Sequence, residues 1–295
     1  MQYGDRLVST FLPTSLLLLA LCLGACNSGG SSSSSSPAGV DATESSGQQF
    51  GAPTRTQIRP GVEVSSRNGS CTSNFLYAAN SATVYIGVAA HCFSEDTNSG
   101  TDPCKARNEA LGFDGITIEN ARHPGTLAYS SWAAMQQNGE QSGSDLCALN
   151  DFALVQIHAD DLANVHPAAI GFGGPKSLFV GLAAVGDTVY SYGQSPAHGG
   201  VNDLEKKRGR ITQVVAGGLA YRVSSDSAGL PGDSGSAVLH QDGRALAVLS
   251  DVGFGVGVAP VSNGVVNLER ALNYAKTGGF IPASTSLVTW AEFSP

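Results

Sequence analysis

"LPGDSGSAV", residues 230–238, contains Gly-Asp-Ser-Gly followed by a short apolar run. Two interpretations compete. Gly, Asp and Ser are the residues of solvent-exposed turns, because they accept the backbone angles and local hydrogen bonds of tight turns. The same residues can also form a loop that presents a nucleophilic serine. The stretch alone does not distinguish a turn from a nucleophile loop, so the rest of the chain has to decide.

Length and charge limit the classes of function. The chain has 295 residues and a formal charge of −8, enough for one two-lobed domain or two small ones. Phosphate binding requires clustered cations, and no block of Lys or Arg is present. The run "EKKRGR" at 205–210 is too short to change this, and we expect it in a solvated loop. We therefore expect no nucleic-acid partner.

Residues 1–25 are predicted to be a signal rather than part of the fold. The apolar stretch "LLLLALCLGA" at 16–25 is short for a membrane-spanning helix. It leads into Leu23-Gly24-Ala25-Cys26, which resembles the lipobox of bacterial lipoproteins. The resemblance implies a lipid on Cys26 and an exported protein anchored to a membrane of the bacterial cell envelope, periplasmic or at the cell surface. A plain signal peptide and an uncleaved anchor are the alternatives.

A flexible linker is predicted over residues 26–60. It opens with "NSGGSSSSSSPAG" and stays low in complexity to about Pro60, a composition typical of a tether. With Cys22 in the signal and Cys26 lipidated, an even number of cysteines remains. In an exported protein this predicts two disulfides, and three pairings are open for Cys71, Cys92, Cys104 and Cys147.

The remainder of the chain is rich in short β-type runs. Runs such as "ATVYIGVAA" and "FALVQIHA" are separated by Gly, Asn, Asp and Pro, which favours an all-β barrel or sandwich. "VLHQDGRALAVLS" predicts a hairpin with Asp242-Gly243 at its turn. One helix is predicted near the end, with Asn267 as its cap and Gly278 after its last turn. Its apolar residues repeat at helical spacing: Leu268, Ala271, Leu272 and Ala275.

Two further motifs bear on the opening stretch. "VAAHC" at 88–92 places His91 after an apolar strand, and "NDFALVQI" at 150–157 places Asp151 at the head of another. A lone histidine or aspartate in such a place is usually structural, and a single match to a short motif is only a hypothesis. Together with Ser234, however, the three motifs resemble the active-site signatures of the chymotrypsin-like (trypsin-fold) serine proteases, in that family's order of His, Asp and Ser.

The resemblance assigns catalytic roles that fit the chemistry. A serine hydroxyl is a poor nucleophile at neutral pH, so Ser234 needs His91 as a base. Asp151 would orient the imidazole and stabilise its positive charge. The backbone N–H groups of Gly232 and Ser234 would form the oxyanion hole. The implied function is a serine endopeptidase that cleaves protein or peptide substrates through an acyl-enzyme, without cofactor or metal.

The resemblance also implies the fold. We expect two six-stranded antiparallel β-barrels over residues 61–278, divided near residue 178, with a C-terminal α-helix and a tail at 279–295. Cys71 and Cys92 match a family disulfide that braces the histidine strand, which leaves Cys104 with Cys147. We expect a monomer.

Substrate selection is assigned to a pocket that involves Ala228, Ser250 and Val252. The residue six before the nucleophile, Ala228, would form the floor of this pocket. An uncharged floor would leave a basic side chain desolvated without a partner. Val252 would narrow the wall, whereas Ser250 matches a serine that hydrogen-bonds the triad aspartate. We therefore expect cleavage after small or medium apolar residues.

Activation is the feature that the resemblance leaves open. In many animal members a freshly cut N-terminus pairs with the aspartate that matches Asp233, and nothing near "RPGVEVSS" resembles such a terminus. Asp233 then pairs with an internal cation, or the enzyme is held inactive. Two other functions compete with the endopeptidase: a binding lipoprotein that keeps the fold without turnover, and an esterase with the same triad.

Overall fold

The computed structural model describes residues 50–96, 101–201, 205–227, 229–253 and 262–295. All of them belong to one compact unit, Glu44–Pro295. The predicted signal, most of the predicted linker and Cys26 lie outside the described residues. Within the described ranges, no helix combines the length and the apolar character that crossing a bilayer requires.

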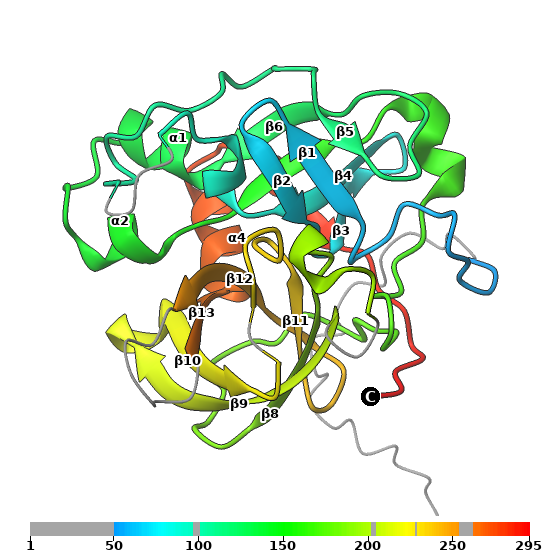
Figure 1. The fold of residues 1–295 in the computed structure, drawn as a ribbon. Coiled ribbons are helices and arrows are strands. Elements are labelled where there is room, and N and C mark those ends of the chain that lie inside the picture. The colour runs from blue at the N-terminus through cyan, green and yellow to red at the C-terminus, as the bar shows by residue number, and fades with distance from the viewer. Residues whose placement is uncertain (1–49, 97–100, 202–204, 228, 254–261) are drawn as a thin grey trace, which may run out of the picture. The chain divides into compact units, whose positions relative to one another are not determined.

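The N-terminal half of this unit contains two antiparallel sheets (Figure 1). The larger has five strands in the order β14-β3-β4-β7-β6, and the smaller has the order β2-β1-β5. The strands of the larger sheet are β3 (Leu76–Asn80), β4 (Thr83–Val88), β6 (Thr126–Ser130), β7 (Ala153–Gln156) and β14 (Ser286–Leu287). Those of the smaller sheet are β1 (Glu63–Ser66), β2 (Gly69–Thr72) and β5 (Thr117–Ile118).

The C-terminal half closes into a six-stranded barrel with the order β10-β13-β12-β11-β8-β9. Its strands are β8 (Thr188–Tyr192), β9 (Lys206–Val215), β10 (Ala220–Ser225), β11 (Ala237–His240), β12 (Ala245–Gly253) and β13 (Ser262–Asn267). This barrel confirms the expected second barrel. The expected first barrel is confirmed only in part, because the described strands of this half form a five-stranded and a three-stranded sheet rather than one closed six-stranded barrel. One of these strands, β14, comes from the predicted tail.

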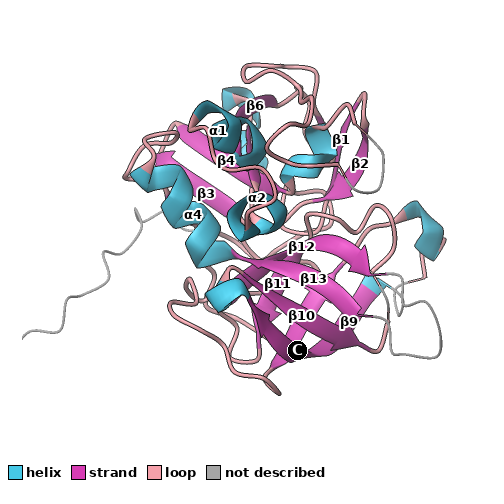
Figure 2. Ribbon diagram, turned by 90° about the vertical axis from the view of Figure 1, so that its left-hand side faces the viewer, coloured by secondary structure: helices cyan, strands magenta, loops and turns pink. Residues whose placement is uncertain are grey.

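Short helices connect these strands. They are η1 (Ala90–Phe93), α1 (Ser131–Gln137), α2 (Asp145–Leu149), η2 (Ala159–Asn164), η3 (Pro196–His198), η4 (Ala216–Gly218) and α4 (Leu268–Thr277). The predicted C-terminal helix is confirmed as α4, and the Asn267 side chain caps it by accepting a hydrogen bond from Arg270 N–H. Its apolar face packs against β12, β13 and α1 (Figure 2).

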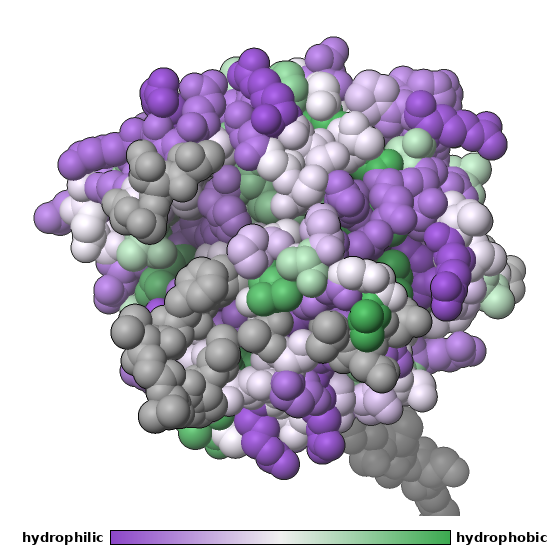
Figure 3. Space-filling view, in the orientation of Figure 1, coloured by the Kyte–Doolittle hydropathy of each residue, from purple (hydrophilic) through white to green (hydrophobic). Residues whose placement is uncertain are grey.

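The predicted hairpin is also confirmed. Strands β11 and β12 pair antiparallel, and Gly243 in the turn between them has a φ of +86°, a conformation that glycine adopts without strain. On the face of the molecule that Figure 3 shows, hydrophilic residues predominate among the coloured atoms, and hydrophobic residues form small, separated patches.

The folded region extends past both predicted boundaries. On the N-terminal side, Ile58 is fully buried and bridges Val165. On the C-terminal side, Val288 N–H donates to Leu76 O, and the Trp290 ring packs edge-on against His166. Residues 50–60 and 279–295 are therefore part of the fold, because their few apolar side chains find partners that are distant in the chain.

The basic run at 205–210 is not the solvated loop that the sequence suggested. It leads into β9, where exposed and buried residues alternate from Lys206 to Ile211. The charged side chains of Lys206, Arg208 and Arg210 are exposed, whereas Lys207 lies on the buried face.

Candidate active site

His91 and Asp151 are brought together by the pairing of two adjacent strands. The antiparallel register of β4 and β7 pairs Val88 with Ala153. His91 follows Val88 by three residues, on η1, and Asp151 precedes Ala153 by two. The end of one strand and the start of its partner lie at the same sheet edge, so the two residues become neighbours although sixty positions separate them.

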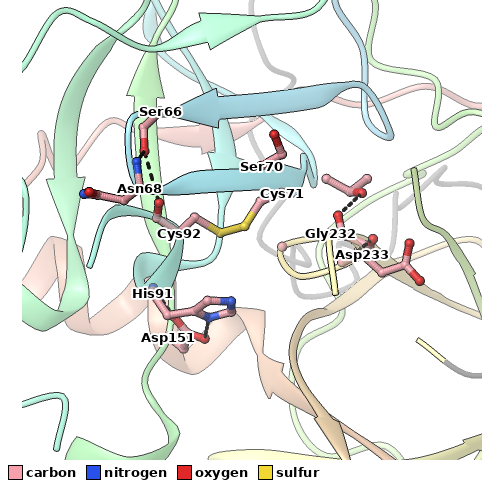
Figure 4. The surroundings of a disulfide bond; sticks show 12 residues. Ser66, Asn68, Ser70, Cys71, His91, Cys92, Asp151, Gly232 and Asp233 are labelled. Carbon is pink, nitrogen blue, oxygen red and sulfur yellow. Dashed lines mark hydrogen bonds and ion pairs between the residues drawn. A yellow bond between two sulfur atoms is a disulfide. The ribbon is translucent and has the colours of Figure 1, made fainter. Parts of the chain in front are cut away.

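The Asp151 carboxylate holds His91 through both its backbone and its side chain (Figure 4). Asp151 Oδ1 accepts a hydrogen bond from His91 N–H at 2.9 Å, and Oδ2 lies 2.6 Å from His91 Nδ1. Asp151 is 4% exposed, whereas 30% of the His91 side chain is exposed. The hydrogen bond at Nδ1 thus fixes the orientation of the imidazole.

The electrostatics of the pair favour its charged form. Burial alone would lower the pKa of His91, but the charge and hydrogen bond of Asp151, with a further contribution from the Asp251 charge, outweigh burial and raise this pKa above its ordinary value. Burial likewise would raise the pKa of Asp151, but His91 and the Ser250 hydroxyl lower it on balance. Asp151 therefore remains ionised beside the imidazole.

Ser250 links this pair to the second barrel. It lies in β12, and its Oγ donates a hydrogen bond to Asp151 Oδ2 at 2.6 Å. This is the contact that the family resemblance implied. It stabilises the carboxylate by a charge-assisted hydrogen bond and ties the position of the aspartate to a strand of the other half of the unit.

Ser234 lies on the loop between β10 and β11, and β2 holds this loop close to the segment that carries the histidine. Thr72 N–H donates to Ser234 O at 2.9 Å, and Thr72 Oγ1 donates to Gly232 O at 2.8 Å. The neighbouring Cys71 forms a disulfide with Cys92, directly after His91 (Figure 4). The disulfide therefore connects the strand that supports Ser234 to the helix that carries His91.

The structure forms no hydrogen bond between Ser234 Oγ and His91. Ser234 is 8% exposed, and its loop is held by backbone groups and by the side chains of Thr72 and Asp233. Nucleophile and base pairs are often loosely aligned without substrate and tighten in the substrate complex. The structure brings Ser234 to the region of His91 and Asp151. The direct hydrogen bonds in this region join His91, Asp151 and Ser250.

Gly232 and Ser234, whose N–H groups are expected to form the oxyanion hole, have backbone conformations and contacts that suit this role. Gly232 has a φ of +104°, and a Cβ there would lie 3.1 Å from both Pro196 Cδ and Ser195 Cα, so only glycine fits. The carbonyls of Gly232 and Ser234 bind Thr72. Among the described residues, none accepts a hydrogen bond from the N–H of either residue, which leaves both groups available to bind an anionic oxygen.

The neighbouring Asp233 is buried in a site that the sequence did not assign. Lys207 Nζ lies 3.1 Å from its Oδ2, and His198 Nε2 lies 2.8 Å from the same oxygen. The N–H groups of Ser195 and Leu230 also donate to this carboxylate. Of the two alternatives for Asp233, the structure contains the internal cation. Burial lowers the pKa of Lys207, and the charge of Asp233 opposes that shift.

Sequence reasoning missed Lys207 and His198 as functional residues. It gave His198 no role, and it placed Lys207 in a solvated run. The available signal was the spacing of basic residues at 206, 208 and 210, because alternate residues of a strand face the same side. Lys207 then faces the opposite, buried side.

The substrate pocket is only partly described. Ala228 lies outside the described residues, and of Val252 only the backbone is described. Ser250 is in the site, bound to Asp151. Asp251, which a shift of one residue would turn inward, pairs with Arg222 at 2.8 Å, and half of its side chain is exposed.

Within the described ranges, three groups of side chains could approach a metal ion. Two of them include cysteines that are already joined, in the disulfides Cys71–Cys92 and Cys104–Cys147. The third is His123, His158 and Asp160. His158 Nδ1 already accepts a hydrogen bond from Asp160 N–H, and this group does not belong to the site around Ser234.

Comparisons with known proteins give a family match and a similar fold. The family model described as "Trypsin-like peptidase domain" matches residues 72–248. The structure of Thermobifida fusca protease A is similar, with a TM-score of 0.51 and 17% identity, over 79% of this chain and 99% of that one. Cellulomonas bogoriensis chymotrypsin gives a TM-score of 0.47 and 18% identity over the same shares of the two chains. A search of curated protein sequences finds no significant match.

At such identities, the likeness to Thermobifida fusca protease A shows a shared fold and nothing more.

Proposed function

The chain belongs to the trypsin-like peptidase family, and we propose that it is a serine endopeptidase that uses Ser234, His91 and Asp151. The observation that carries the proposal is the buried Asp151 carboxylate, bound at once to His91 Nδ1, His91 N–H and Ser250 Oγ. A surface turn has no need of an ionised carboxylate aligned on a histidine in this way.

The residues would act in sequence. Ser234 Oγ attacks the carbonyl carbon of the scissile bond and transfers its proton to His91 Nε2, while Asp151 stabilises the imidazolium. The carbonyl oxygen becomes anionic and is bound by the N–H groups of Gly232 and Ser234. His91 then protonates the leaving amine, and water, activated by His91, hydrolyses the acyl-enzyme.

Labelling with a fluorophosphonate tests this proposal directly. We expect the probe to modify the purified folded domain at Ser234 and to leave Ser234→Ala unlabelled. Ser70→Ala is a matched control, since Ser70 lies two residues from Thr72 on β2 and its hydroxyl binds Glu63 instead. Labelling of Ser234→Ala at the wild-type rate would refute Ser234 as the nucleophile.

The cell location is part of the proposal. Leu23-Gly24-Ala25-Cys26 and the serine-rich stretch behind it support a lipid on Cys26 and a tethered domain in the bacterial envelope. Mass spectrometry of the mature N-terminal peptide tests this, with a diacylglyceryl-modified Cys26 as the expected result. An unmodified N-terminus at another residue would contradict it and leave the catalytic proposal intact.

A further inference from the structure

A hollow separate from the pocket assigned to Ala228, Ser250 and Val252 lies near the nucleophile loop. The segment before β1 and the strands β8 and β9 contribute to its walls. The residues that matter for its chemistry are Arg55, Arg59, Glu119, Tyr192, Gln194 and Lys206. Three of these six are cations, in a chain whose formal charge is −8.

Arg59 is the deepest of the three cations. It is only 8% exposed, and its guanidinium donates hydrogen bonds to the carbonyls of Thr54, Ala168 and Ala169. No described residue forms an ion pair with it. A buried charge normally has a counterion. Arg59 instead has only backbone carbonyls as partners among the described residues, so no carboxylate cancels the positive potential that it contributes to the hollow.

Arg55 and Lys206 are held at the rim. The loop of Arg55 is fixed because Asn120 Nδ2 donates to Arg55 O at 3.1 Å. Lys206 extends its aliphatic stem over Gly171, which has no side chain to displace it, and its ammonium lies 5.1 Å from the centre of the Phe172 ring. Neither cation has an ion-pair partner among the described residues, so both are available to an incoming anion.

Glu119, the one acidic residue among the described lining residues, is already engaged. Glu119 Oε2 accepts hydrogen bonds from Glu63 N–H and from Gln194 Nε2. The Tyr192 hydroxyl donates to Glu205. With three cations and one carboxylate, the described lining keeps a net charge of +2.

The hollow adjoins one flank of the nucleophile loop. Its wall residue Gln194 donates from its backbone N–H to Thr72 Oγ1, which in turn binds Gly232 O. The other flank is occupied by β12, since Gly235 N–H donates to Leu249 O at 2.7 Å. The proposed pocket for the acyl part of the substrate involves Ser250 and Val252 on β12, and this assignment puts the hollow on the side of the leaving group.

We propose that this hollow binds aspartate and glutamate side chains of a polypeptide substrate, C-terminal to the scissile bond. The inference rests on the proposed endopeptidase function and adds a substrate class to it. Carboxylates would form directional, charge-assisted hydrogen bonds with Arg55 and Lys206 at the rim. The positive charge of Arg59 would attract them further.

The test compares two internally quenched peptides that differ only after the cleavage site, one with Glu-Asp-Glu and one with Gln-Asn-Gln. We expect wild type to cleave the acidic peptide with about fivefold higher kcat/KM, the order of magnitude for two partly exposed charge pairs. Arg55→Gln with Lys206→Gln should abolish this preference by lowering kcat/KM for the acidic peptide to the value for the neutral one. Arg122→Gln, an exposed arginine outside the hollow, should retain the preference. Arg59 stays unchanged in these variants because it holds its own segment against Ala168 and Ala169.

Equal cleavage of the two peptides by wild type would overturn the inference and leave the endopeptidase proposal standing. Failure to cleave either peptide would count against the endopeptidase proposal instead. In that case, fluorescence anisotropy of the labelled peptides on Ser234→Ala protein decides the inference, with tighter binding of the acidic peptide expected. Binding of inorganic phosphate together with equal binding of the two peptides would contradict it.

Discussion

Lys207 Nζ lies 3.1 Å from Asp233 Oδ2, and the two side chains are 5% and 0% exposed. The carboxylate also accepts hydrogen bonds from Ser195 N–H and Leu230 N–H. It thereby joins the segment after β8 to the loop that carries Gly232 and Ser234. An internal lysine, assisted by His198, thus fixes the loop whose N–H groups would bind the oxyanion.

Replacing this lysine should impair both stability and catalysis. In Lys207→Met, Asp233 keeps His198 but loses a buried charge partner. We expect the free energy of unfolding to fall by about 3 kcal/mol and kcat to fall more than KM changes, because the oxyanion loop loses its position. Urea unfolding and peptide kinetics measure both. Lys105→Met, whose side chain is 70% exposed, is the control. Wild-type kcat in Lys207→Met would show that the pair does not position the loop.

The triad should behave as a unit. Ser234→Ala, His91→Ala and Asp151→Asn each remove a group without which the others cannot act, so each should lower kcat by about 10⁴-fold. The double and triple variants should lose little more than Ser234→Ala. Steady-state kinetics on one peptide substrate test this, and multiplicative losses in the double variants would exclude a concerted role.

The pH dependence of kcat/KM should follow His91. The base must be neutral, and Asp151 and Asp251 raise the pKa of His91, so activity should rise with pH through a value above 6.5. Replacing Asp251 removes a negative charge near His91 and so destabilises the protonated imidazole. Asp251→Asn should therefore move the acidic limb to lower pH, more clearly at low salt because Asp251 is half exposed. Asp114→Asn, outside the site, should leave the limb in place, and an identical limb in Asp251→Asn would contradict the assignment of the base.

The same pKa shift affects stability. Since the folded-state pKa of His91 is raised, its interaction with Asp151 stabilises the fold fully below the unfolded pKa, and this contribution is lost as pH rises through the folded value. His91→Ala should lose stability relative to wild type more strongly at pH 5 than at pH 8. Thermal unfolding at the two pH values measures this difference, and equal losses would contradict the shift.

Ser250 should act as a positioning residue. In Ser250→Ala, Asp151 loses a hydrogen bond of 2.6 Å, the pKa of Asp151 rises, and the imidazole is less well oriented. We expect kcat to fall about tenfold, the value of one hydrogen bond to a charged group, with KM little changed. Ser250→Thr keeps the hydroxyl and should restore activity. A change in KM alone would place Ser250 in substrate binding rather than in positioning.

Cleavage specificity should be apolar before the scissile bond. An uncharged Ala228 offers no partner to Arg or Lys, and Val252 would limit the size of the side chain, so we expect cleavage after Ala, Val or Leu. Profiling with a peptide library tests this preference. Dominant cleavage after Arg or Lys would show that the pocket residues are assigned to the wrong positions.

The sequence by itself determined the features that depend on a few neighbouring residues. Asn267 before an apolar repeat predicts the start of α4, and Asp242-Gly243 predicts the β11–β12 hairpin, because caps and tight turns are local chemistry. The order of His91, Asp151 and Ser234 identified the family because each lies in a short motif of its own. Ser250 was found by the same resemblance.

Only the tertiary structure decided the features that join distant segments. Asp233 finds its cation 26 positions upstream in Lys207, because strand β9 turns alternate residues into the barrel and the pairing of β8 with β9 brings that strand beside the loop. Arg59, Gln194 and Lys206 share one hollow for the same reason, although nothing in their local sequence relates them. Burial and charge pairing are set by which strands become neighbours, and that depends on the packing of the whole chain rather than on any single stretch of it.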